Sequence, residues 1–121
     1  MQRDRRIDYI EFASQDPAAS RAFFQAVFGW QFQEYGPDYT AFDDGRLQGG
    51  FYRAAPVSTD TAGAPLVVLY ADQLQPVIEA ILAAGGELLK PVFSFPGGSR
   101  FHFREPGGNA LAVWSERDPD G

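Results

Sequence analysis

The signals of one complete helix lie in DPAASRAFFQAVFGW, residues 16–30. Aspartate is a favoured N-cap and proline is favoured in the first turn, so the helix should begin directly after Asp16. Apolar residues then recur at helical spacing, and Gly29 follows them as a C-terminal stop. Residues 7–14, just before this stretch, are rich in apolar, β-branched and aromatic residues. The pattern therefore predicts a strand that leads into a helix.

The same order of signals occurs twice along the chain. Three short strands are predicted after the first helix, at 30–34, 39–42 and 47–53, before a Pro/Gly/Ser/Thr-rich stretch at 54–65. A second strand and helix follow, with Asp72 as the expected N-cap and Gln75 as its capping-box partner. Strands are then predicted at 87–93, 99–104 and 109–116. The offset of about 56 residues indicates two βαβββ modules, at about 7–53 and 65–116, in one α+β domain of residues 1–121.

The composition limits the classes of function. With 121 residues and 45% hydrophobic residues, the chain can bury a core, and it contains no cysteine for disulfides or thiolate chemistry. No apolar run approaches the roughly 20 residues of a membrane span, and no secretory signal is evident, so cytoplasmic residence is expected. The net charge of −6 opposes binding to nucleic acid. We therefore expect a small-molecule ligand, with no nucleic-acid or membrane partner.

The sequence resembles the vicinal-oxygen-chelate superfamily, the group of glyoxalase-like, bleomycin-resistance and dioxygenase domains. Residues 16–24 and 27–30, the helix end at 84–86, and FREPGGN at 103–109 carry the resemblance, which extends from Ile7 to Trp114. The resemblance implies that the two modules form an open, curved mixed-sheet barrel around a cavity, with the helices outside. It also implies a homodimer, which would cover exposed sheet edges.

The alternation of side chains along the strands predicts which residues face the cavity. Ile10 and Phe12 suit the helix-covered core, which leaves Tyr9 and Glu11 for the other face. The same reasoning places Phe101 and Phe103 in the core and turns Arg100, His102 and Arg104 inward. The predicted ligand-binding residues are Tyr9, Phe51, Tyr70, Arg104 and Trp114, and the candidates for acid–base catalysis are Glu11 and His102.

The resemblance also implies where a metal would bind in the metal-dependent members. The corresponding positions hold Tyr9, Gly49 or Gly50, Leu66 and Ala112. Only tyrosine among these residue types occasionally serves as a ligand, and the single histidine cannot supply a 2-His-1-carboxylate site. We expect no metal and no cofactor, so neither a standard metal-dependent glyoxalase I nor an extradiol dioxygenase is favoured.

Three hypotheses about function remain open. The first is a metal-independent small-molecule-binding protein of the glyoxalase/bleomycin-resistance type, with aromatic and a few charged residues lining its cavity. The second is a lyase or isomerase in which Glu11 or His102 transfers protons and Arg104 holds an anionic group. The third is a purely structural or interaction role, in which Glu11 forms ion pairs and His102 is a satisfied barrel histidine. Whether the protein is an enzyme is left open by the sequence.

Overall fold

The computed structural model describes residues 4–59 and 63–116, and each half of the chain forms one sheet and one helix. The first half contains β1 (Tyr9–Ser14), α1 (Pro17–Phe28), β2 (Gln31–Glu34), β3 (Tyr39–Asp43) and β4 (Gln48–Arg53). The second half contains β5 (Val68–Tyr70), α2 (Leu74–Ala83), β6 (Glu87–Phe95), β7 (Gly98–Arg104) and β8 (Ala110–Ser115). The predicted pair of βαβββ modules is confirmed.

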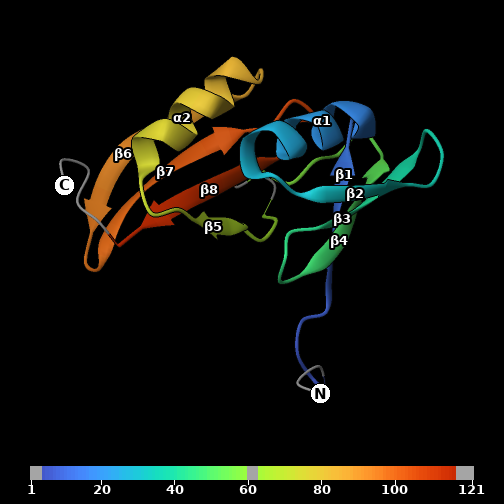
Figure 1. The fold of residues 1–121 in the computed structure, drawn as a ribbon, viewed down its shortest axis with the longest axis horizontal. Coiled ribbons are helices and arrows are strands. Elements are labelled where there is room, and N and C mark those ends of the chain that lie inside the picture. The colour runs from blue at the N-terminus through green and yellow to red at the C-terminus, as the bar shows by residue number, and fades with distance from the viewer. Residues whose placement is uncertain (1–3, 60–62, 117–121) are drawn as a thin grey trace.

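Both sheets have four strands and the same topology. Their orders are β1-β4-β3-β2 and β5-β8-β7-β6. In each sheet the first strand pairs in parallel with the last, and the remaining pairs are antiparallel. Figure 1 shows α1 and α2 on the same side of the two sheets, so the opposite faces carry no helix. The arrangement is open and not closed into a barrel, in agreement with the open mixed sheets that were predicted.

The first helix begins and ends where the sequence predicts, but the second does not. The side chain of Asp16 accepts a hydrogen bond from the Ala19 amide at 3.2 Å, and Gly29 ends α1 in the left-handed conformation. The prediction that Asp72 caps α2 is wrong, because Gln73 is the N-cap residue and makes no side-chain cap bond. The carbonyl of Asp72 instead accepts from the Ser115 hydroxyl, so the chain still lies against β8 at this point.

The core is mainly aromatic and joins the two halves. Phe24 of α1 stacks on Trp30 and on Phe51, with ring centroids 4.4 Å and 5.4 Å away. Its neighbour Phe23 stacks on Phe103 of β7 at 5.9 Å. Helix α1 therefore covers the first sheet and also contacts the second. Helix α2 buries Leu74, Ile78 and Ile81, whereas Leu82 is 52% exposed.

A buried polar cluster also connects the halves, and we call it the clasp: Ser14, Ser20, Glu105, Gly107 and Asn109. The Glu105 side chain is 1% exposed and accepts hydrogen bonds from the Ser20 hydroxyl, the Gly107 amide and Nδ2 of Asn109. Nδ2 of Asn109 also donates to the carbonyl of Ala13 in β1, at 2.7 Å. Burial raises the pKa of Glu105, although its hydrogen bonds act in the opposite direction. The clasp fixes one module against the other.

None of the helices in the described part of the chain is long and apolar enough to cross a membrane.

Candidate functional site

The helix-free face of the first sheet carries polar aromatic residues. Phe12 of β1 is buried and stacks on Phe51 at 5.2 Å, on the side of α1. Its neighbours Tyr9 and Glu11 are exposed, as expected for side chains on the opposite face of a strand. The cross-strand partners of Glu11 and Tyr9 are Gly50 and Gln48 of β4. Small and polar residues therefore lie beside both side chains.

Tyr39 of β3 links Tyr9 and Glu11 in a chain of hydrogen bonds. Its hydroxyl donates to Oε2 of Glu11 at 3.0 Å and lies 2.5 Å from the hydroxyl of Tyr9. Burial, together with the bonds to Tyr9 and Glu11, raises the pKa of Tyr39 well above its usual value. Tyr39 therefore keeps its proton and remains a donor to Glu11. We call Tyr9, Tyr39 and Glu11 the tyrosine chain.

Gly50 makes room for the tyrosine chain. A Cβ atom on Gly50 would overlap the hydroxyl of Tyr39, so a larger residue there would displace this group. Sequence analysis missed Tyr39, because its contact with Glu11 depends on the pairing of three strands. The available signal was the pair Gly49-Gly50 inside a predicted strand, since a strand glycine often marks the close approach of another group.

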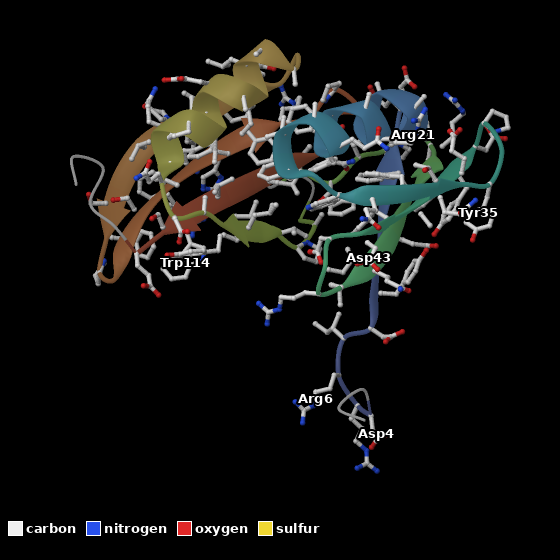
Figure 2. All side chains as sticks on the ribbon, viewed as in Figure 1. Asp4, Arg6, Arg21, Tyr35, Asp43 and Trp114 are labelled. Carbon is white, nitrogen blue, oxygen red and sulfur yellow. The ribbon has the colours of Figure 1, made fainter. Side chains whose placement is uncertain are left out.

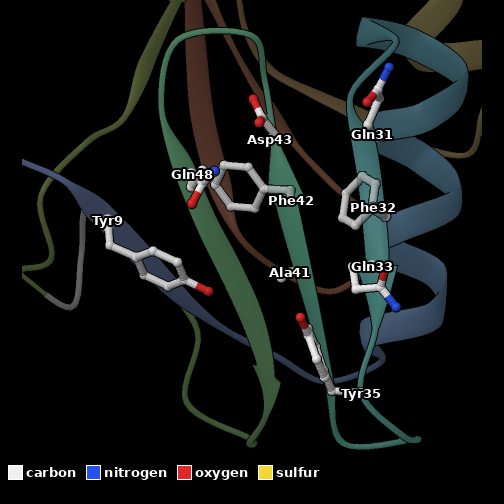
Figure 3. Close-up of a pocket in the computed structure, with 9 residues that line it drawn as sticks. All are labelled: Tyr9, Gln31, Phe32, Gln33, Tyr35, Ala41, Phe42, Asp43 and Gln48. Atoms are coloured by element: carbon white, nitrogen blue, oxygen red, sulfur yellow. The ribbon is translucent and has the colours of Figure 1, made fainter.

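Beside the tyrosine chain is a depression of about 310 Å³ (Figure 3). The hydroxyls of Tyr9 and Tyr35 point toward Ala41 near its middle, and Asp43 lies at the far end. Among the described residues that line it, none is basic. The lining consists of Tyr9, Gln31, Phe32, Gln33, Tyr35, Ala41, Phe42, Asp43 and Gln48. Its polar groups are phenols, amides and one carboxylate.

The helix-free face of the second sheet is aromatic and basic. Trp114 of β8 and Tyr70 of β5 meet edge to face, with ring centroids 5.0 Å apart. His102 of β7 is 7% exposed and stacks on Phe93 at 6.0 Å. The guanidinium of Arg100 donates to Nε2 of His102, and the distance from Nη2 of Arg100 to this nitrogen is 3.0 Å. The same guanidinium lies over the Phe93 ring. This face differs in charge from the face of the first sheet.

A large cleft, of about 920 Å³, lies between the two modules. Ile10 and Phe12 of β1 line one side, and Val68, Tyr70 and Trp114 line the other; Figure 2 labels Trp114 on the helix-free side of its sheet. Most of the residues that line the cleft are apolar or aromatic, and Asp44 and Arg46 also line it. Apolar and aromatic side chains with a few polar groups are typical of the lining of a small-molecule site.

The structure brings some of the predicted residues together and separates others. Tyr9 and Glu11 meet through Tyr39, and Tyr70 and Trp114 share the large cleft. Glu11 also borders a smaller hollow of about 380 Å³ beside the segment that joins the modules. None of these three hollows is lined by both Glu11 and His102.

Two further predicted residues have partners that bear on their roles. Arg104 forms an ion pair with Glu87 at 2.9 Å on the exposed part of its strand. The prediction that Phe51 contacts a ligand is wrong, because its side chain is fully buried against Phe12 and Phe24. In β4 the helix-free positions belong to Gly50 and Tyr52, and this places Phe51 on the core side.

The residues at the family's metal positions do not fit a metal. Gly50 has no side chain, and the space in front of it holds the Tyr39 hydroxyl. Ala112 is buried, and neither alanine nor the leucine at position 66 has a donor atom in its side chain. No group of three or more His, Asp or Glu side chains suited to a metal occurs in the described residues. The chemistry of this donor set argues against the metal centre of the metal-dependent members.

The fold is that of a protein of paired βαβββ modules with open sheet faces. A family model described as the glyoxalase/bleomycin resistance protein/dioxygenase superfamily matches residues 6–113. The chain therefore belongs to this superfamily. No curated protein sequence matches it significantly.

Solved structures with the same fold have very different sequences. A glyoxalase/bleomycin resistance protein/dioxygenase family enzyme from Burkholderia phytofirmans PsJN matches with a TM-score of 0.75 and 20% identity, over 92% of this chain and 100% of its own. Lactoylglutathione lyase from Agrobacterium tumefaciens matches with a TM-score of 0.69 and 17% identity, over 94% of this chain and 96% of its own. A fosfomycin resistance protein from Mesorhizobium loti matches with a TM-score of 0.73 and 11% identity, over 92% of each chain. At such identities the similarity is one of fold alone.

Proposed function

We propose that this protein binds a small organic molecule without a metal, through the aromatic and charged side chains of its helix-free sheet faces. The observation that carries the proposal is the large cleft bordered by Tyr70 and Trp114, whose edge-to-face rings form an aromatic wall. Aromatic rings can stack on a planar ligand or attract a cationic one. The unsuitable residues at the family's metal positions support the metal-independent part of the proposal.

Tryptophan fluorescence during titration with a library of planar aromatic compounds tests this proposal. The chain has two tryptophans, and both line the cleft, but Trp30 is buried, so most ligand-dependent quenching should come from Trp114. We expect the quenching to be largely lost in Trp114→Phe and largely kept in Trp30→Phe. A ligand that binds only the folded state should also raise the melting temperature. Absence of any binder in both measurements would refute the proposal.

The proposal includes a homodimer in the cytoplasm. Several large apolar side chains are exposed on the described chain, and Val68, Tyr70 and Phe93 gather on the helix-free side of the second sheet. Apolar surface of this kind commonly becomes buried in an interface. A second copy would also cover the open edges of β1 and β5. Cell fractionation would test the compartment.

A second candidate function is that of a lyase or isomerase. The favouring observation is that Tyr39 orients the exposed carboxylate of Glu11, as a positioned general base requires. His102 would be the second proton-transfer group, supplied from the other sheet. Deuterium exchange of enolisable ketones, followed by NMR in D₂O, would reveal such a base. Exchange above the buffer rate that disappears in Glu11→Gln would support catalysis, and exchange unchanged by the substitution would exclude this role.

A further inference from the structure

We infer that the depression on the first sheet, beside the tyrosine chain, recognises the ligand through an organic cation with N–H donors, such as an ammonium group on an apolar body. This inference rests on the proposed function and specifies the class of ligand. It follows from two independent features, the direction of the hydrogen bonds in the tyrosine chain and the charge of the depression.

The direction of the hydrogen bonds is determined by what each group can donate. A carboxylate only accepts, so the single hydroxyl proton of Tyr39 points to Glu11. The hydroxyl of Tyr9 must then donate to Tyr39, since Tyr39 has no second proton. The hydroxyl protons of Tyr9 and Tyr39 are thus both donated within the tyrosine chain. Toward solvent the chain presents only lone pairs, so a ligand must bring the donors.

The charge of the depression favours a positively charged donor over a neutral one. Asp43 lies at its far end and is the one carboxylate that lines it. Glu11 adds a second carboxylate that does not line the depression but is linked to Tyr9 through the hydroxyl of Tyr39. Oδ1 of Asp43 accepts from the Gly45 amide at 2.8 Å, which holds the carboxylate in place. Hydrogen bonds between a cation and a carboxylate are roughly twice as strong as neutral ones.

The shape of the depression favours a small apolar body attached to the cation. Ala41, near its middle, has a small side chain that leaves room above the sheet at this point. The rings of Tyr9 and Tyr35 border the same space and can attract a cation through their faces. A volume of about 310 Å³ matches the lower end of small-molecule pockets, at roughly 300 Å³.

NMR titration of the full-length protein with 2-phenylethylamine, 2-phenylethanol and 3-phenylpropionate tests the inference. The three probes have similar apolar bodies and differ in charge and hydrogen bonding. We expect the amine to bind about tenfold more tightly than the other two. Its chemical-shift changes should be concentrated at residues 9–11, 31–35 and 39–48. Equal affinity for all three probes, or no binding of the amine, would overturn the inference.

Substitutions then distinguish the effect of a carboxylate's charge on amine affinity from the effect of its hydrogen bonds. Asp43→Asn keeps an oxygen for the Gly45 amide but removes the charge, and Glu11→Gln does the same for the tyrosine chain. Each should lower amine affinity about tenfold and leave the alcohol unaffected. Gly50→Ala should weaken amine binding by displacing the Tyr39 hydroxyl, without removing any polar group. Asp72→Asn, an exposed carboxylate in the second half, is the matched control and should have no effect.

The outcome is distinguishable from failure of the proposed function. If library compounds quench Trp114 while the amine shows no preference, the proposed function stands and the inference fails. If no compound binds at all, both fail. If Glu11→Gln and Asp43→Asn instead dissociate a dimer and leave amine affinity unchanged, the acceptors face a cation of a second copy, and the inference is again overturned.

Discussion

The hydroxyl of Ser20 donates a hydrogen bond of 2.8 Å to the buried carboxylate of Glu105, 85 positions away in the chain. Ser20 lies on α1 and Glu105 directly follows β7, so this bond joins the first module to the second. The Ser20 hydroxyl also lies 2.7 Å from the hydroxyl of Ser14 at the end of β1. The relative placement of the two sheet faces thus depends on a small number of buried polar contacts.

Ser20→Ala should therefore destabilise the protein. Removing the hydroxyl takes one of three side-chain or amide donors from Glu105 and one hydrogen-bond partner from Ser14, and the loss of a partner from a buried polar group costs about 1–3 kcal/mol. Urea denaturation should show this loss in the free energy of unfolding. Ser94→Ala is the matched control, because the Ser94 hydroxyl lies 3.4 Å from that of Ser99 and its residue is exposed. The control should stay within about 0.5 kcal/mol of the wild type.

The raised pKa of Glu105 predicts a specific pH dependence of stability. A carboxyl whose pKa is higher in the folded state binds its proton more tightly there. Its contribution to stability is complete below the ordinary glutamate pKa of about 4.3 and is lost as the pH rises through the raised value. Relative to Glu105→Gln, the wild type should lose free energy of unfolding as the pH rises from acidic to neutral. A difference that is constant or increases with pH would contradict this assignment.

Phe103→Ala should cost about 3–5 kcal/mol, since the ring is fully buried and stacks on Phe23 between the modules. Phe93→Ala on the neighbouring strand removes the same number of atoms from an exposed position. It should cost far less in the same denaturation experiment. A double-mutant cycle with Phe23→Ala would measure the coupling across the modules, and additivity of the two substitutions would argue against a direct contact.

Val68→Asp should weaken the proposed homodimer. Val68 is exposed on the helix-free side of the second sheet, and a buried unpaired charge in an interface is unfavourable. Light scattering at micromolar concentration should give the mass of a dimer for the wild type and a lower mass for the variant. Leu82→Asp places the same charge at an exposed apolar position on α2 and should remain dimeric. A wild type that is monomeric at this concentration would exclude the dimer.

Purified protein should contain less than about one-tenth equivalent of nickel, zinc, iron or manganese, because among the donor positions of the metal-dependent members only Tyr9 carries a side-chain donor atom. Elemental analysis would test this. Treatment with a chelator should also leave the melting temperature unchanged. Stoichiometric metal that is lost in His102→Ala would overturn the prediction.

Local signals in the sequence were sufficient for the repeated framework. Asp16, Gly29 and the alternation of Ile10 and Phe12 with their neighbours act within one element, so they could be interpreted without knowledge of the fold. The failures depend on contacts between elements. Phe51 follows two glycines that give no alternation, and its face is set by pairing with Phe12. Asp72 does not cap α2, because the chain around it is still bonded to β8.

For the candidate site, the sequence could predict the face on which a single side chain lies but not the contacts between side chains. Strand alternation separated Tyr9 and Glu11 from the core, but no spacing indicated that Tyr39 would connect them. The placement of the two sheet faces involves contacts between the halves such as Ser20–Glu105 and Phe23–Phe103, and no sequence pattern predicts such contacts. For the same reason the sequence did not indicate that Glu11 and His102 share none of the three hollows described above.

The parallel pairing of the first strand with the last completes each sheet within its own half of the chain. Each sheet contains only strands from its own half of the chain. Substitutions on one exposed face therefore leave the backbone hydrogen bonds of the other sheet intact. The two faces of this chain accordingly differ in chemistry, one carrying phenols and carboxylates and the other indole and guanidinium groups. Substitutions can thus change the chemistry of the exposed face on one half while the other half keeps its own sheet.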